Sequence, residues 1–360
     1  MAQVGGAPKL RDVAALAGVS QGTASNVWNK PDIVREEVRA KVMAAAEALG
    51  YGGPSPQGRL LRAGRAHAIG IAAGEPLDYF FADPWARRLL TEVARICDAR
   101  GAGLALVSVS GGKHLGWTIE SALVDGFLLR CGGKDLLVEV TQKRGLPFVA
   151  LSLDTEEPDV PAIDIDDFSG ARDAGRHLLG LGHRRLAILG IGFGEEAGFV
   201  TPEAARATRF VNVRERALGY WAALAEAGIG EAEVPIVALR NDASNVGAAL
   251  APLFDGVARP PTGLLCMSDN LAMAALDWLE ERGRRVPEEV SVVGFDDVPP
   301  AAWAAYDLTT YRQCVNQMVG ETVTTLLDSI EGKSTEPRRV KIDGTLVVRK
   351  STWEPKGGRA

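Results

Sequence analysis

A short polar segment near the N-terminus has side chains suited to contacting the edges of nucleic-acid bases. Hydroxyl, amide and glycine positions follow one another closely there: Ser20, Gln21, Gly22, Thr23, Ser25 and Asn26. An asparagine amide can donate and accept at once, so in the major groove it can form a paired hydrogen bond with adenine. The segment therefore predicts a DNA-binding surface.

Three short helices are expected to present this surface. Apolar residues within 10–17 have helical spacing, and Gly18 suits the end of that helix. Ser20 is a good N-cap for a second helix that Pro31 ends, and a third helix is expected over about 35–49. Two helices joined by a glycine-containing turn, with an exposed polar face on the second, form a helix-turn-helix unit. A three-helix bundle without a DNA-binding role is the alternative.

The distribution of charge supports a DNA-binding segment in a chain whose net charge is −6. Residues 1–65 contain nine Lys and Arg and five acidic residues, a net charge of +4, so the remaining 295 residues carry −10. A basic head attached to an acidic remainder is compatible with DNA binding, because only the head has to meet phosphates.

Length and composition exclude several classes of protein. A chain of 360 residues with 46% hydrophobic and 24% charged residues should form two or three globular units. No apolar stretch is long enough to span a membrane and the N-terminus lacks a secretory signal, so we expect a cytoplasmic, nucleoid-associated protein. The four cysteines and four histidines lack metal-ligand spacing, and neither a nucleophile elbow nor a phosphate-binding loop occurs. We predict no metal, no cofactor and no enzymatic activity.

From His67 onward, apolar runs alternate with helical patterns. Eight runs are predicted as strands: AIGIAA, LALVSV, GFLLR, FVALSL, RRLAILG, VPIVAL, GLLCMS and VSVVGF. This alternation is typical of parallel sheets covered on both faces, and eight strands favour two doubly wound α/β lobes. Such folds bind ligands at the carboxyl ends of their strands.

Both parts of the chain resemble the lac-repressor (LacI/GalR) family of transcription regulators. The head carries the resemblance in RDVAALAGVSQGTASNVWN, VREEVRAKVMAAAEALGY and GRLLRAGRAHAIGI, and the remainder carries it in VDGFLLR, GHRRLAILG, VRERALGYWAALAEAGI and TGLLCMSDN. The resemblance implies an N-terminal all-α helix-turn-helix domain and a periplasmic-binding-protein-like α/β core of two doubly wound lobes.

The resemblance also implies domain boundaries. It places the DNA-binding head at 1–53, a hinge helix at 54–66 and the effector-binding and dimerisation core at 67–354. Lobe one is expected at about 67–165 and 297–328, and lobe two at about 166–296 and 329–354. In the hinge, the family pattern places Leu61 as a wedge in the minor groove, with Arg59 and Arg62 near phosphates; ordinary linker packing is the alternative.

Six core residues match effector-binding positions of the family: Trp85, Ser152, Arg216, Asp242, Asp269 and Asp296. The resemblance assigns Arg216 to effector hydroxyls or a carboxylate, and Asp296 to ligand hydroxyls or amines. Ser152 stands where the family often has aspartate, and Asp242 where it has an aromatic residue. Alternatives are a structural ion pair for Arg216, a helix cap for Asp269 and core packing for Trp85.

Taken together, these features predict a sequence-specific DNA-binding regulator, in the first instance a repressor. Its partners are expected to be a pseudopalindromic operator in double-stranded DNA, a small-molecule effector of carbohydrate type and a second copy of the chain in a homodimer. A solute-binding protein or a cytoplasmic enzyme on the same α/β core is the alternative.

Overall fold

The computed structural model describes residues 8–53, 64–109, 119–130, 134–153, 159–192, 198–241, 243–333 and 337–355. The chain divides into two units, one ending at Ala66 and the other beginning at His67. His67 is also where the sequence places the start of the α/β core. Each unit contains hydrophobic clusters of its own.

Within residues 8–53 the chain forms the three predicted helices and one 3₁₀ turn: α1 (Leu10–Ala17), α2 (Gln21–Asn29), η1 (Pro31–Ile33) and α3 (Glu36–Leu49). Gly18 ends α1 with φ 67°, a left-handed conformation that glycine adopts without steric cost. Ser20 caps α2, because its Oγ accepts a hydrogen bond from the amide of Thr23 at 3.0 Å. Val13 and Val42 are fully buried between the helices, and this shared core fixes the orientation of α2.

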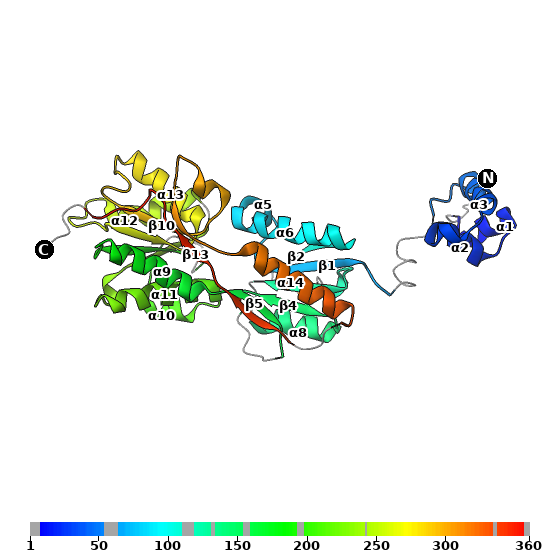
Figure 1. Ribbon diagram of the computed structural model, residues 1–360, viewed down its shortest axis with the longest axis horizontal. Coiled ribbons are helices and arrows are strands. Elements are labelled where there is room, and N and C mark those ends of the chain that lie inside the picture. Colours follow the sequence, from blue (N-terminus) through cyan, green and yellow to red (C-terminus); the bar gives the residue numbers. More distant parts are fainter. Residues whose placement is uncertain are drawn as a thin grey trace, which may run out of the picture. The chain divides into compact units, whose positions relative to one another are not determined.

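The first sheet of the core has the order β12-β5-β4-β3-β1-β2, and all its strands are parallel. Its strands are β1 (Ala68–Ala73), β2 (Gly103–Ser108), β3 (Gly126–Arg130), β4 (Phe148–Leu151), β5 (Ala162–Ile165) and β12 (Arg339–Ile342). The accompanying helices are α5 (Tyr79–Ala82), α6 (Pro84–Arg100), α8 (Lys134–Arg144) and α14 (Val315–Ile330). Helices α6 and α14 pack on one face and α8 on the other (Figure 1).

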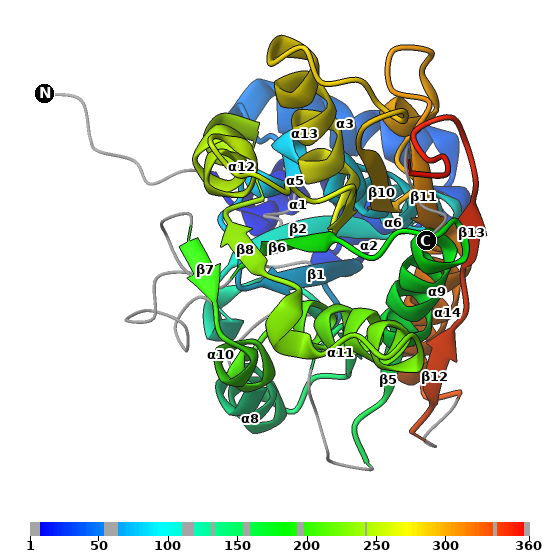
Figure 2. The same ribbon diagram turned by 90° about the vertical axis from the view of Figure 1, so that its left-hand side faces the viewer.

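The second sheet has the order β13-β11-β10-β9-β6-β8-β7, with antiparallel strands at both edges. Its strands are β6 (Leu186–Ile191), β7 (Gly198–Val200), β8 (Ile236–Leu239), β9 (Gly263–Cys266), β10 (Ser291–Asp296), β11 (Thr309–Arg312) and β13 (Thr345–Val347). Its helices are α9 (Asp167–Gly180), α10 (Pro202–Ala207), α11 (Val211–Glu226), α12 (Val246–Phe254) and α13 (Asp269–Glu281), with short 3₁₀ turns η2 (Glu231–Glu233), η3 (Ala243–Asn245) and η4 (Pro299–Ala302). Figure 2 shows α9 and α11 on one face of this sheet and α12 and α13 on the other.

All eight apolar runs predicted as strands form strands of these two sheets. Burial explains the pattern: strands covered by helices on both faces are apolar throughout, as in β3 and β9, whose residues are all buried. The predicted α/β class with two doubly wound lobes is therefore confirmed.

The strand pairing corrects two of the expected lobe boundaries. Strand β11 was placed in lobe one, within 297–328, but it pairs in parallel with β10 of the second sheet. Strand β12 was placed in lobe two, within 329–354, but it pairs in parallel with β5 of the first sheet. The chain therefore crosses between lobes after β5, after β11 and after β12, because each strand joins the sheet edge where its backbone groups find hydrogen-bond partners.

Candidate functional site

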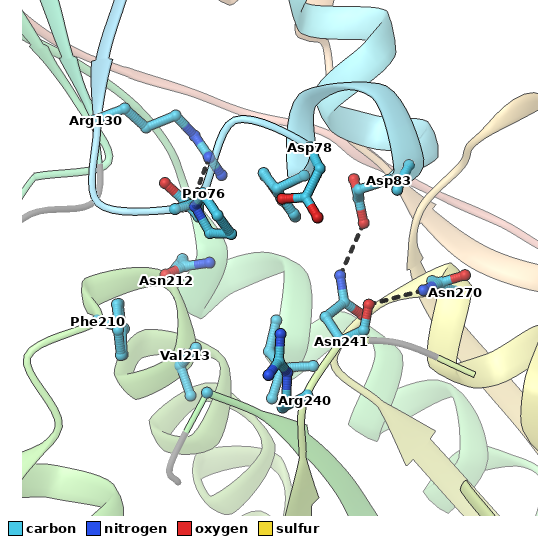
Figure 3. Close-up of a pocket in the computed structure, with 15 residues that line it drawn as sticks. Pro76, Asp78, Asp83, Arg130, Phe210, Asn212, Val213, Arg240, Asn241 and Asn270 are labelled. Atoms are coloured by element: carbon cyan, nitrogen blue, oxygen red, sulfur yellow. Dashed lines mark hydrogen bonds and ion pairs between the residues drawn. The ribbon is translucent and has the colours of Figure 1, made fainter. Parts of the chain in front are cut away.

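A cleft lies between the two lobes, at the carboxyl ends of strands from both sheets. Its outer chamber has a volume of about 590 Å³, and a smaller inner chamber of about 30 Å³ shares several of the same walls. Arg130 ends β3 in the first lobe, whereas Ile191 ends β6 and Asn241 follows β8 in the second. Figure 3 shows the side chains that converge on the outer chamber from both lobes. Four of the six predicted effector residues line the inner chamber: Trp85, Ser152, Arg216 and Asp296.

Arg216 lies on α11 with only 5% of its surface exposed. Its Nε donates to Asp167 Oδ1 at 2.8 Å, and its Nη2 lies 3.7 Å from Asp296 Oδ1. The guanidinium stacks over the ring of Phe295 at 3.8 Å from the centroid, and Nη1 donates to the carbonyl of Met267. The structural ion pair weighed for Arg216 is therefore present, and the same side chain also lines the inner chamber.

The carboxylates around Arg216 are buried with it. Burial raises the pKa of Asp167 and of Asp296, and the adjacent guanidinium opposes both shifts. A guanidinium held between two acids at a fixed position can donate to the paired oxygens of a ligand without a large change in its own geometry. The base of the cleft thus holds two buried carboxylates beside a fixed guanidinium.

A hydrogen-bonded chain links Asp296 to the opposite lobe. The Nε1 of Trp85, on α6, donates to Gln313 Oε1 at 2.8 Å, and Gln313 Nε2 donates to Asp296 Oδ1 at 2.6 Å. Gln313 directly follows β11, at one of the crossings between lobes. Trp85 is thereby oriented by a polar bond and is not held by core packing alone.

Arg130 and Glu75 form a second buried ion pair, which the sequence did not indicate. Arg130 Nη1 donates to Glu75 Oε1 at 2.6 Å, and the guanidinium lies 4.6 Å from the centroid of the Trp85 ring. That face of Trp85 is therefore covered by a cation and does not present itself to a sugar ring. A sequence signal for Arg130 did exist: it is the last residue of the predicted strand GFLLR, and ligands of such folds bind at the carboxyl ends of strands.

Asp83 and Asn241 meet across the cleft and were also missed. Asp83 is the N-cap of α6, and its Oδ1 accepts from the amide of Ala86 at 2.9 Å. The sequence signal was Asp83 before Pro84, since an acidic cap followed by proline commonly starts a helix. Burial raises the pKa of Asp83.

Asp269 does not line either chamber of the cleft. It is fully buried, its Oδ1 accepts from Thr310 at 2.5 Å and its Oδ2 from the amide of Val298 at 2.8 Å. Burial raises its pKa to about 7. The carboxylate therefore holds the loop after β10 against β11, and the N-cap of α13 is Ser268 instead. Assigning Asp269 to the effector was wrong because the first residue of α13 turns inward.

Of the two remaining predicted effector residues, the structure describes Ser152 but not Asp242. Ser152 follows β4 with φ 51° and its amide donates to Asp164 Oδ1 at 2.7 Å. Asp242 lies outside the described residues, although its neighbour Asn241 is well placed in the cleft. Among the described residues, no group of three or more His, Cys, Asp or Glu side chains could hold a metal ion.

On the head, Gln21 and Gly22 are exposed at the start of α2, while Asn26 is partly buried one turn further along. The hydroxyls of Ser20 and Thr23 lie 2.8 Å apart in the helix cap. Asn29 Nδ2 donates to Ser25 Oγ at 3.0 Å. The predicted hinge residues Arg59, Leu61 and Arg62 lie outside the described residues.

Within the ranges that the structure describes, no helix is both long and apolar enough to cross a lipid bilayer.

Comparison with known proteins identifies both units. Residues 9–53 match the family of bacterial regulatory proteins, lacI family, and residues 176–352 match the periplasmic binding protein-like domain. An HTH-type transcriptional regulator of Mycobacterium tuberculosis is 36% identical over 310 residues, which cover 84% of this chain and 86% of the relative. The chain belongs to the LacI family.

Other relatives of this LacI-family chain extend over nearly its whole length. The regulator CelR of Thermobifida fusca is 33% identical over 353 residues, covering 96% of this chain and 98% of CelR. The solved CelR–cellobiose complex is 31% identical, covers 96% of this chain and 99% of its own, and superposes with a TM-score of 0.67. The operator-bound lac repressor dimer shares the fold, with a TM-score of 0.75 at 24% identity over 97% of this chain and 100% of its own. This LacI-family chain is therefore a DNA-binding transcription regulator with a helix-turn-helix head and a periplasmic-binding-protein-like core.

Proposed function

We propose that this LacI-family protein is an operator-binding repressor whose DNA affinity is set by a neutral polyhydroxy effector, a sugar or sugar derivative, in the interlobe cleft. The observation that carries the proposal is the buried Arg216–Asp296 pair at the base of that cleft, within a chain that also bears a helix-turn-helix head. CelR, a relative over nearly the whole chain, has been solved with cellobiose, which supports a carbohydrate in the corresponding space.

The chemistry of the cleft favours an uncharged ligand. Its two buried guanidiniums are already paired with acids, Arg130 with Glu75 at 2.6 Å and Arg216 with Asp167 at 2.8 Å. Asp78 and Asp83 add further negative charge on the first-lobe wall. At Arg130 and Arg216 a phosphate or carboxylate would have to displace these acids, whereas hydroxyl groups can accept from the arginines and donate to the aspartates.

On the head, we propose that the exposed face of α2 enters the major groove. Gln21, Ser25 and Asn26 would contact base edges there, while Ser20 and Thr23 hold the cap, and Gly22 leaves room for close approach. A Cβ at Gly22 would meet only the Ser20 hydroxyl, at 3.7 Å. The hinge assignments of Leu61, Arg59 and Arg62 stay predictions, as does the homodimer that would place two heads on a pseudopalindrome.

In the mechanism we propose, effector binding changes the angle between the lobes and so favours or disfavours the DNA-bound arrangement of hinge and head. Effector and operator must then alter one another's affinity by the same factor.

Two measurements test the proposal. Fluorescence anisotropy on the protein's own promoter DNA should show binding that weakens steeply between 50 and 200 mM salt, roughly 1000-fold if about six phosphates are contacted. Asn26→Ala should lower operator affinity at least about tenfold, while Glu47→Gln on α3 should not. Absence of salt-sensitive binding would favour the solute-binding or enzyme alternative.

For the effector, a thermal-shift screen should compare neutral sugars and polyols with their phosphorylated counterparts. Bound ligand raises the apparent melting temperature by mass action. We expect stabilisation by a neutral compound and its loss in Arg216→Lys, which keeps the charge but loses the planar donor fork. Stabilisation by the phosphorylated compounds only would refute the proposed effector class.

A further inference from the structure

Besides the Trp85–Gln313–Asp296 chain, a direct side-chain hydrogen bond joins the two lobes across the cleft. Asn241 Nδ2, after β8 of the second lobe, donates to Asp83 Oδ2, at the start of α6 of the first lobe, over 2.9 Å. Figure 3 shows the two side chains facing each other across the outer chamber. The acceptor carboxylate belongs to a residue with 6% of its surface exposed, and the bond is partly buried.

Asp83 and Asn241 each also hydrogen-bond to the N-terminal cap of a helix. Asp83 uses its other oxygen to accept from the amide of Ala86 at 2.9 Å, which caps α6. Asn241 Oδ1 accepts from Ser268 Oγ at 2.6 Å, and Ser268 Oγ in turn accepts from the amide of Leu271, which caps α13. One continuous chain of hydrogen bonds therefore connects the N-terminus of a first-lobe helix to that of a second-lobe helix.

The amide of Asn241 has only one orientation compatible with this chain. The ionised Asp83 carboxylate can only accept, so the NH₂ group of Asn241 faces it and Asn241 Oδ1 accepts from the Ser268 hydroxyl. Asn270 fixes the backbone as well, because its Nδ2 donates to the carbonyl of Asn241 at 2.9 Å. Such preorganisation strengthens the bond because little side-chain freedom is lost when it forms.

The bond lies where the outer and inner chambers meet. Asp83 and Asn241 line both of them. The inner chamber, where Arg216 and Asp296 lie, has a volume of about 30 Å³, far below the several hundred Å³ of a typical small-molecule pocket. A sugar ring cannot occupy that space until the walls separate.

We propose that the Asp83–Asn241 bond is a latch that holds the two lobes together and that must open before an effector reaches Arg216. The proposal rests on the effector-binding role of the cleft put forward above. It makes Asp83 and Asn241 positioning residues for lobe closure, in addition to the residues at the base of the cleft.

When the Asp83–Asn241 bond opens, both side chains become available to hydrogen-bond with the effector. Asp83 offers an acceptor and Asn241 a donor, and one hydroxyl group satisfies both because it donates one hydrogen and accepts another. An anionic group at the same place would meet the Asp83 carboxylate. The latch therefore favours a hydroxyl-bearing group at the chamber boundary.

Hydrogen–deuterium exchange on the full-length, ligand-free protein tests the latch. Asp83→Ser keeps a helix-capping side chain but is too short to reach Asn241, and Asn241→Ala removes the donor from the opposite lobe. Asp78→Ser is the matched control, since it removes a carboxylate from the same wall of the outer chamber without touching the bond. Peptides of α1 to α3 serve as an internal reference within the head.

We expect each latch variant to speed exchange about tenfold in peptides containing Arg216 and Asp296, because a bond to a charged acceptor has been lost. The double variant should exchange no faster than the faster single variant, since both remove the same contact. Exchange in Asp78→Ser should match the wild type.

Unchanged exchange at Arg216 and Asp296 in Asn241→Ala would overturn the latch, as would additive effects in the double variant. If exchange in Asp83→Ser became faster only in α6, the variant would have lost the α6 cap and not a contact between lobes, and this result would also overturn the latch. All these outcomes are measured without ligand or DNA, so they are separate from the failure of operator or effector binding in the experiments above.

Discussion

Arg216 illustrates how this protein accommodates buried charge at the scale of single residues. It is surrounded by the Asp167 carboxylate, the Asp296 carboxylate, a backbone carbonyl and the face of Phe295. Removing one partner of a buried pair leaves the other charge uncompensated, which is more costly than the pair itself is stabilising. The same set of residues therefore contributes to stability in addition to its proposed role in effector binding, and sequence alone could not separate the two roles.

Asp164, a partly buried acid, should titrate in a way that is visible in stability. Burial raises its pKa to about 6 from an ordinary value of 3.8. Because the folded state holds the proton more tightly than the unfolded state, the stability from this group is full at low pH and is lost as pH rises from about 4 through 6. Between pH 4 and pH 7 the loss is at most about 3 kcal/mol.

Asp164→Asn should remove this loss, since an amide does not titrate and its oxygen can still accept from the Ser152 amide. Urea denaturation at pH 4.5 and pH 7 should show a smaller decrease in unfolding free energy with pH than in the wild type. Asp173→Asn, at an exposed position of α9, is the control. An identical pH dependence in Asp164→Asn and wild type would contradict the assignment.

At the scale of elements, the packing of α9 against α11 positions the Arg216–Asp167 pair, because each helix carries one partner. The helices approach closely at glycines. A Cβ at Gly219 would lie 2.9 Å from the Ala171 Cβ and 3.0 Å from the Arg172 amide, and a Cβ at Gly175 would lie 2.8 Å from the Ala223 Cβ. These contacts are too short for any side chain, so the sequence uses glycine inside both helices.

Gly219→Ala is therefore expected to destabilise the core by about 1–3 kcal/mol through overpacking, although alanine favours helix more than glycine does. Gly180→Ala, at the end of α9 with open space around its Cβ, provides the matched control and should be neutral or slightly stabilising. Urea denaturation of both variants measures the difference. Equal stability of the two variants would show that α9 and α11 adjust without strain.

At the scale of the whole molecule, the helix-turn-helix head and the periplasmic-binding-protein-like core are separate units with separate hydrophobic clusters. Val13 is fully buried in the head, so Val13→Ala should destabilise that unit by about 2 kcal/mol. Operator affinity should fall, while the calorimetric transition of the core should stay at its wild-type temperature.

Leu16→Ala is the control for this experiment, because Leu16 lies on the same helix with 57% of its surface exposed. It should change neither DNA binding nor either transition. A shift of the core transition in Val13→Ala would mean that the two units unfold as one.

Much of this organisation could be predicted from local patterns. The capped and glycine-ended helices of the head, the eight apolar strands and the opposed charges of the two units depend on neighbours in sequence, and the structure agrees with the elements predicted. Strand β5 was not among the predicted runs, because Ala162–Ile165 is only four residues long and includes Asp164. Such a strand exists because β4 and β12 provide hydrogen-bond partners on either side.

Sequence patterns alone were enough to predict the family, the helix-turn-helix head and the α/β class, and they proposed Arg216 and Asp296 as effector-binding residues. The folded chain was needed to show which lobe receives β11 and β12, that Asp269 turns inward, and that Asp83 meets Asn241 across the cleft. This difference arises because the interactions act over different distances along the chain. Caps, periodicity and apolar runs act within a few residues, whereas Asp83 and Asn241 are 158 positions apart and come together only when two sheets fold around one cleft.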